Sequence, residues 1–171
     1  MNTYEFTVIL DRVPSDQQTD ALFEAGLDDT MPGLEDGRGV LDVARQAENL
    51  AAAIVSVVTQ VETTGLRVVG VLDVDLVSLR TVAARLGRLY ESVRLYATGK
   101  RGDGSFPPVV SADGWSLVSW QAVAVWAREH LHLDTETSEQ ERTLAAANHL
   151  LAARALTPAI ERARLAPLVA A

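Results

Sequence analysis

The segment Leu79–Phe106 constrains the fold most, because it places small and apolar residues at the offsets that two closely crossing helices require. Ala83 leaves room for a second helix, Gly87 permits the left-handed backbone of a tight turn, and Val93 packs the second helix onto the first. The sequence therefore predicts a helix from Leu79, a turn, and a second helix over about Leu89–Thr98. Three more residues complete the small core of this pair: Val82, Leu86 and Tyr96.

The charge of the chain is divided unevenly along its length. The formal net charge is −8, and residues 1–77 carry 4 basic and 14 acidic side chains. Between Arg80 and Arg101, by contrast, six basic residues accompany the single acid Glu91. Counterion release depends on the patch that faces phosphate, so an acidic chain can still bind nucleic acid through a basic part. We expect the acidic half to repel DNA outside that patch.

A basic, glycine-rich loop, Gly99–Gly104, follows the second predicted helix. Three glycines and two adjacent cations suit a wing whose backbone approaches phosphate, while the second helix enters the major groove. Arg reads guanine in a forked geometry and Ser suits several base edges, so Arg94 and Ser92 are expected in the groove. For Arg80 or Arg85 taken alone, an ordinary solvated helix surface is the alternative. The predicted contact residues are Arg80, Arg85, Arg88, Tyr90, Ser92, Arg94, Lys100 and Arg101.

The N-terminal half predicts strands and helices in the order strand–helix–strand–strand–helix–strand, which is the split βαβ, ferredoxin-like arrangement. Ser15 caps the first helix, and Gly26 and Gly65 close the two helices. In the alternative, an irregular α+β domain, the third element is only a loop. The predicted elements are Tyr4–Leu10, Asp16–Ala25, Leu27–Met31, Gly39–Ala44, Gln46–Thr64 and Leu66–Leu72.

The C-terminal part predicts further helices. One starts at about Ser119, and a capping box of Ser138 with Glu141 opens another that runs to about Ala155. The apolar stripe of that helix fits packing against one other element, either the body of the protein or a second subunit. The stripe is Leu144, Ala147, Leu151 and Ala155. The fold class is therefore α+β, with an acidic domain over 1–76, a DNA-binding domain over 77–132 and a helical extension over 133–171.

The residues after the second helix resemble a known family. The run from Gly104 to Pro107, followed by Trp120, Val123 and Trp126, resembles the excisionases and AlpA-type phage regulators, which are related to the MerR-type DNA-binding domain. This resemblance covers about Leu79–Arg128 and implies a winged helix-turn-helix. The N-terminal YEFTVILD and the segment Ala25–Asp29 resemble the HicB-like antitoxin half-domain. Together they imply a DNA-binding regulator whose ferredoxin-like half mediates oligomerisation or contacts a partner.

The chain departs from the excisionase-like pattern in three places. Leu89 and Tyr90 stand where a hydroxylated or basic pair is usual. Asp103 puts an anionic charge into the expected wing, and Val118 replaces a frequent aromatic residue, which leaves Trp120 to fill that space. We expect these changes to affect DNA affinity and sequence choice more than the fold.

Composition and motifs argue against several other classes of protein. The chain has no cysteine, so disulfides and thiolate metal sites are excluded. The acidic turn around Asp28, Asp29, Glu35 and Asp36 lacks the ligand order of a calcium loop and is expected to be solvated. His130 and His132 are expected to be surface histidines rather than zinc ligands. No G-x-S-x-G, P-loop or H-E-x-x-H pattern occurs, so neither catalysis nor a cofactor is expected.

Targeting signals are not evident either. The N-terminus MNTYEFTVILD lacks the basic and apolar regions of a signal peptide, and the longest apolar run, around Leu50–Val58, is too short to cross a bilayer. We therefore expect a cytoplasmic, non-catalytic regulator of transcription that binds duplex DNA as a dimer or higher oligomer. The alternative is an antitoxin-like interaction module whose acidic half binds and inhibits a basic protein.

Overall fold

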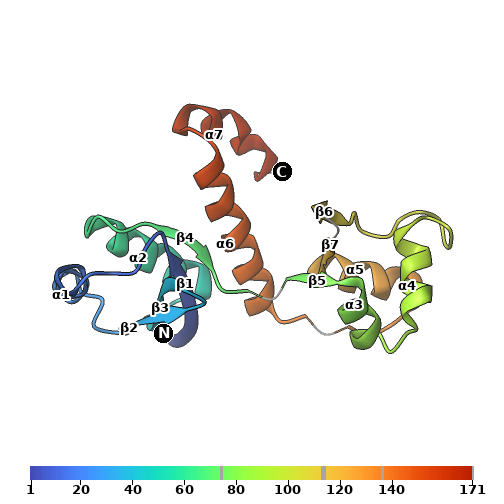
Figure 1. Ribbon diagram of the computed structural model, residues 1–171, viewed down its shortest axis with the longest axis horizontal. Helices are drawn as coiled ribbons and strands as arrows, with labels where there is room; N and C mark the ends of the chain where they lie inside the picture. The colour runs from blue at the N-terminus through green and yellow to red at the C-terminus, as the bar shows by residue number, and fades with distance from the viewer. Residues whose placement is uncertain (74, 113–114, 136, 171) are drawn as a thin grey trace. The chain divides into compact units, whose positions relative to one another are not determined.

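The computed structural model describes residues 1–73, 75–112, 115–135 and 137–170, and these form two compact units (Figure 1). The first unit comprises residues 1–73 and 143–171, and the second comprises residues 74–142. Each unit contains one antiparallel sheet together with helices. The predicted α+β class is therefore confirmed. No helix among the described residues has both the length and the apolar character needed to cross a membrane.

The first unit is built on a four-stranded sheet with the strand order β2-β3-β1-β4, in which all neighbouring strands are antiparallel. The predicted alternation of strands and helices is present, although several bounds differ. The elements are β1 (Asn2–Leu10), α1 (Asp16–Glu24), β2 (Thr30–Glu35), β3 (Arg38–Ala47), α2 (Leu50–Thr63) and β4 (Val68–Val71).

The strand predicted over Leu27–Met31 begins later than expected, at Thr30. The backbone N–H of Leu27 donates to the carbonyl oxygen of Leu22 at 3.1 Å, and Gly26 before it has a φ of 82°. This bond closes the C-terminus of α1, so Leu27 belongs to the helix cap and not to the sheet. Asn49 likewise caps α2, which starts after the predicted Gln46 because residues 46 and 47 continue β3.

One face of this sheet is buried beneath α1 and α2. Strand alternation turns Phe6, Val8 and Leu41 towards the helices, while Thr7 and Asp42 stay on the other face. From α2, Ala53, Ile54, Val57 and Val61 pack into the same core. The helical spacing read from the sequence therefore placed the apolar face of α2 correctly.

Helix α6 (Glu139–Leu156) protects the outer edge of β4. The Asn148 Oδ1 accepts a hydrogen bond from the Val71 N–H at 3.2 Å, and the Arg154 guanidinium donates to the Val68 carbonyl at 2.9 Å. An exposed strand edge invites aggregation, so side chains that satisfy its backbone groups protect the sheet.

The apolar stripe predicted for α6 is largely the one that packs on the body of the first unit. Leu151 is buried, Leu144 and Ala147 lie against the same core, and Ala155 is exposed. Asn148, predicted to lie off the stripe, is on the packed side because β4 offers it a backbone N–H. Residues 143–171 are thus part of the first unit rather than a separate extension. The chain continues through α7 (Ala159–Leu165) and the 3₁₀ turn η1 (Ala166–Leu168).

The second unit combines a short sheet of strand order β5-β7-β6 with three helices. Val82, Ala83, Leu86 and Val93 are all buried, which confirms the offsets that the sequence singled out. Trp120, Val123 and Trp126 are buried in the same core. The elements are β5 (Leu76–Ser78), α3 (Leu79–Arg85), α4 (Tyr90–Ala97), β6 (Val110–Ala112), β7 (Trp115–Ser119) and α5 (Trp120–Leu131).

Replacing Gly39 with Ala should lower the free energy of unfolding by about 2–3 kcal/mol, because the new Cβ overpacks a backbone crossing. It would lie 2.8 Å from the Val13 Cα and closer to the Arg12 carbonyl oxygen, and no side-chain rotation relieves either contact. Gly37→Ala is the control: its Cβ meets no atom within 4 Å, although φ is 77°, and about 1 kcal/mol is expected from strain alone. Chemical denaturation followed by circular dichroism measures both, and equal losses would contradict the prediction.

Candidate nucleic-acid interface

Helices α3 and α4 both end on glycines with positive φ, and each glycine is followed by a cation. Gly87 has a φ of 61° and Gly99 a φ of 67°. The N–H of Arg88 donates to the Ala83 carbonyl at 2.9 Å, and the N–H of Lys100 donates to the Leu95 carbonyl at 2.9 Å. Each bond spans five residues and is the one that closes a Schellman motif at the C-terminus of a helix. The backbone of both cations is therefore fixed. A cation at a helix C-terminus is also favoured by the helix dipole.

Three of the predicted arginines lie over aromatic rings. The Cζ of Arg80 is 4.9 Å from the centre of the Tyr90 ring, and that of Arg85 is 4.8 Å from the Trp120 ring. The Cζ of Arg101 is 5.2 Å from the Tyr96 ring. Stacking attracts the cation to the ring face and leaves the N–H groups at the guanidinium edge available to an anion. These arginines are therefore oriented before any ligand arrives.

Arg94 and Ser92, the two residues expected to contact bases, are partly engaged within the protein. The Arg94 Nε donates to the Glu91 Oε2 at 2.9 Å within α4, and both side chains are exposed. An exposed pair of this kind is worth little in stability, so a base or phosphate can displace Glu91. Ser92 is half-buried. Tyr90 is also half-buried, packs on the core and holds the Arg80 guanidinium over its ring.

Arg88 and Lys100 are the least committed cations of this group. Both are exposed, and within the described part of the chain their side chains have no hydrogen-bond, ion-pair or ring partner. Of the eight predicted contact residues, six are therefore cations on α3, on α4, in the turn between them or in the loop that follows. All six lie between residues 80 and 101 of the second unit.

The loop after α4 is anchored on α5 through Trp126. The Trp126 ring lies 5.0 Å from the Tyr96 ring and 4.9 Å from the Phe106 ring, both edge to face, and stacks on His130 at 5.7 Å. Its Nε1 donates to the Ser105 Oγ at 3.1 Å, which also lies 2.9 Å from the His130 Nε2. His130 was expected to be a plain surface residue, and its role here was missed because Ser105 is distant in sequence.

Asp103 is held within the same cluster. Its carboxylate accepts hydrogen bonds from the Ser105 N–H at 3.0 Å and from the Ser105 hydroxyl, and it lies 3.4 Å from the His130 Nε2. The negative charge expected to weaken the wing is thus engaged inside the loop. The cluster is not a catalytic triad, because hydroxyl and carboxylate meet the same ring nitrogen while Nδ1 faces the Trp126 carbonyl at 3.1 Å.

The hairpin of the second unit lies later in the chain than the predicted wing. Gly99–Gly104 contains no strand among its residues, all of which are described, whereas β6 and β7 pair from Val110 with Leu117 to Ala112 with Trp115. Glycine is depleted in strands, so the glycine-rich loop does not form one, and β6 begins only at Val110. Residues 113 and 114, between the two strands, lie outside the described residues.

Asp75 is a structural residue of this unit that sequence reasoning missed. It is 5% exposed, and its Oδ1 accepts hydrogen bonds from the Gln121 N–H at 2.9 Å and the Ser119 hydroxyl at 3.1 Å. Asp75 and Ser119 therefore share the N-terminus of α5, which ties the start of β5 to that helix. An acidic residue near a short strand is visible in the sequence, but its role is not, because its partner Gln121 lies 46 residues away.

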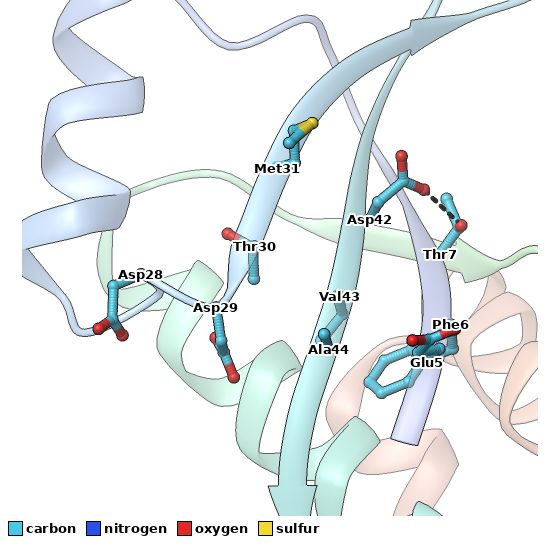
Figure 2. Close-up of a pocket in the computed structure, with 10 residues that line it drawn as sticks. All are labelled: Glu5, Phe6, Thr7, Asp28, Asp29, Thr30, Met31, Asp42, Val43 and Ala44. Atoms are coloured by element: carbon cyan, nitrogen blue, oxygen red, sulfur yellow. Dashed lines mark hydrogen bonds between the residues drawn. The ribbon is translucent and has the colours of Figure 1, made fainter. Parts of the chain in front are cut away.

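The first unit contains a cavity of about 630 Å³ that is lined by residues of β1, β2 and β3 and by the turn before β2 (Figure 2). Asp42 accepts a hydrogen bond from the Thr7 hydroxyl at 2.7 Å, and Asp29 forms a two-pronged ion pair with Arg45. The expected solvated turn is therefore wrong for Asp29, because Arg45 on β3 reaches back to it. An acidic lining repels phosphate, and no metal-binding cluster occurs among the described residues.

The pKa of the Asp103 carboxyl lies below its ordinary value of 3.8, first because the Ser105 hydroxyl donates to it and then because the Ser105 N–H does. Carbon NMR titration should give a midpoint below 3.8, and Ser105→Ala should raise it. Because this pKa is lowered, the contact stabilises the loop above the ordinary value and is lost as pH falls through the lowered one. Equal midpoints in the two proteins would contradict this assignment.

Comparison of the chain with family models, with curated proteins and with solved structures finds no match. The excisionase-like and HicB-like resemblances therefore remain expectations drawn from the residues that carry them. The second unit itself contains a short antiparallel sheet, a helix pair closed by glycines, and three arginines oriented by aromatic rings.

Proposed function

We propose that the second unit is a winged helix-turn-helix that binds duplex DNA, and that the protein is a non-catalytic regulator of transcription. The observation that carries this proposal is the grouping of six cations on α3, α4 and their flanking turns, three of them oriented by aromatic rings. Glu91 is the one acid between Arg80 and Arg101 in the sequence. Such a segment attracts the phosphate backbone even though the whole chain is acidic.

The order of elements supports the winged form. A short strand precedes the helix pair, a hairpin follows it, and the second strand of the hairpin pairs with the first strand of the unit, as Val77 with Val118. In this family of folds the second helix lies in the major groove and the hairpin lies beside it. Helix α4 would then present Arg94 to guanine and Ser92 to a neighbouring base or phosphate. Leu89, which is 79% exposed, would meet thymine methyl groups at the start of the helix.

The remaining cations would contact phosphates and set the register of the protein on the duplex. Arg88 and Lys100 are suited to this because their backbones are fixed and their side chains are uncommitted within the described residues. Arg80, Arg85 and Arg101 would bind phosphate from the exposed edge of a stacked guanidinium.

The first unit would serve oligomerisation or a protein partner. Its strand order β2-β3-β1-β4 supports the ferredoxin-like, HicB-like assignment. Residues 1–73 and 143–171 together carry 14 acidic and 7 basic side chains, so this unit would avoid DNA and confine contact to the second unit. A single DNA-binding unit of this size contacts few base pairs, so a dimer or higher oligomer gives useful sequence specificity.

Arg94→Ala should lower affinity for a preferred duplex by about 1–3 kcal/mol and relax the choice of sequence, because a forked contact to guanine is lost. A preferred duplex is first obtained by selection from a randomised pool with the purified protein. Fluorescence anisotropy then compares this duplex with one of scrambled sequence. If the variant binds both duplexes as the wild type does, Arg94 does not read bases.

Lys100→Ala should weaken all duplexes alike and reduce the slope of log K against log salt by about 1, since one phosphate contact disappears. The matched control is Arg38→Ala, which removes the same charge from an exposed position on β3 of the first unit. The control should bind DNA at least as tightly as the wild type. Equal behaviour of Lys100→Ala and Arg38→Ala would remove Lys100 from the interface.

Absence of any DNA binding at low salt would overturn the proposed function as a whole. Co-purification of a basic protein with the intact chain, together with that absence, would instead support an interaction module that uses the acidic unit. The salt dependence of binding also distinguishes a DNA-binding protein from a protein-interaction module. DNA affinity has to fall steeply with ionic strength when several phosphates are neutralised.

A further inference from the structure

The imidazole ring of His130 has hydrogen-bonding partners at both of its nitrogens. Its Nδ1 lies 3.1 Å from the Trp126 carbonyl oxygen, and its Nε2 lies 2.9 Å from the Ser105 Oγ and 3.4 Å from an Asp103 carboxylate oxygen. A neutral imidazole has one N–H donor and one acceptor nitrogen, whereas the imidazolium has two N–H donors. The charge of His130 in this arrangement therefore depends on whether its partners donate or accept.

Both partners act as acceptors towards the ring. A carbonyl oxygen has no proton to donate, so Nδ1 has to carry a proton to bond with it. The single hydroxyl proton of Ser105 is donated to Asp103, and the Ser105 Oγ also accepts a bond from the Trp126 Nε1 at 3.1 Å. The lone pair of Oγ that remains faces Nε2, so this nitrogen needs a proton as well. All of these hydrogen bonds exist together only when His130 is an imidazolium.

Removing one proton from His130 forces a rearrangement. An unprotonated Nε2 needs a donor, and the Ser105 hydroxyl can serve it only by leaving Asp103. The ion pair between His130 and Asp103 is lost in the same step. Since a hydrogen bond to an ionised group is stronger than a neutral one, deprotonation weakens the attachment of the loop to α5.

Other charged groups near this cluster are directed elsewhere. At the end of α4 the Tyr96 ring packs on Trp126, and the Arg101 guanidinium lies over Tyr96 at 5.2 Å from the ring centre. The positive charge of Arg101 is therefore held on Tyr96.

Helix α5 itself carries charges beside His130. The Arg128 guanidinium donates to the Thr135 carbonyl at 3.1 Å, and Glu129 and His132 are exposed. Within the described part of the chain, Asp103 is thus the charged side chain that meets the ring nitrogen.

We propose that His130 is a positioning residue for DNA binding and makes this binding depend on pH. Its imidazolium holds the loop Gly99–Gly104, which carries Lys100 and Arg101, on α5, and its neutral form releases the loop. The inference rests on the proposed function for its effect on DNA alone, because the order of the loop is a property of the free protein.

The sign of the pH dependence follows from the charges. Histidine side chains change charge between about pH 5 and about pH 8. Asp103 stays ionised throughout this range, since its pKa lies below 3.8. The loop is therefore held at the acidic end of the range and released as pH rises, because only the protonated ring supports the contact.

The first measurement uses the full chain without DNA. Nitrogen NMR at about pH 5.5 and at about pH 8 reports both ring nitrogens of His130 and the mobility of the Gly102 and Gly104 amides. Both ring nitrogens should be protonated at the lower pH, and the two amides should be more mobile at the higher pH. A loop that is equally rigid at both pH values would overturn the proposal.

The second measurement is DNA affinity at the same two pH values and constant ionic strength, by fluorescence anisotropy. The wild type should bind about 3-fold more tightly at the lower pH, as fits a partly exposed charged contact, and His130→Gln should bind equally at both. His132→Asn is the matched control, because His132 is an exposed histidine at the end of the same helix and Asn tolerates its φ of 52°. This control should keep the wild-type ratio of affinities.

Asp103→Ala separates the role of the contact from the charge of the ring. Without the carboxylate, the Ser105 hydroxyl can donate to a neutral Nε2, so the ratio of affinities should disappear although His130 is still present. A ratio that persists in Asp103→Ala would show that the imidazolium attracts phosphate directly, and one that persists in His130→Gln would exclude His130; either result overturns the proposal. Absence of DNA binding at every pH would overturn the proposed function and the effect on DNA, whereas the NMR measurement alone decides whether His130 holds the loop.

Discussion

The indole of Trp126 is the contact on which the second unit depends. Its ring joins Tyr96 at the end of α4 to Phe106 in the following loop, and its N–H holds Ser105. Edge-to-face aromatic pairs are directional, so this one side chain fixes how the loop leaves α4. His130 closes the cluster from the next turn of α5. The loop that carries Lys100 and Arg101 is therefore positioned from the core rather than by solvent-exposed contacts.

The cations of the proposed DNA-binding surface depend on the same apolar framework. Three guanidinium groups lie on aromatic rings that are themselves half-buried or buried, and two other cations follow glycines that close helices. Orientation of this kind lowers the entropy that a long side chain loses on binding. The acidic first unit complements this surface, because like charge keeps phosphate away from the rest of the molecule.

Much of the fold was predictable because its signals are local. Ala83, Gly87 and Val93 specify two crossing helices from within fifteen residues, and the spacing of Leu50, Ile54 and Val57 specifies the buried face of α2. Two predictions of the first unit went wrong, for different reasons. Leu27 closes α1 instead of starting a strand, and Asp29 is paired with Arg45 instead of water. The bond of Leu27 to Leu22 is local and was missed because Gly26 can end a helix without fixing where the next strand starts, whereas the Arg45 that pairs with Asp29 lies 16 residues away.

The sequence by itself determined the helices, the strands of the first unit apart from the start of β2, and where positive charge gathers, because periodicity and composition are properties of neighbouring residues. It did not predict β5, β6 or β7 of the second unit, which are short and are recognised by their pairing. Only the tertiary structure decided how those charges are held. It stacked Arg85 on Trp120, joined His130 to Ser105, and brought Asn148 to the edge of β4. The physical reason is that such contacts join residues 25 to 77 positions apart, and their geometry exists only once the helices and sheets have packed.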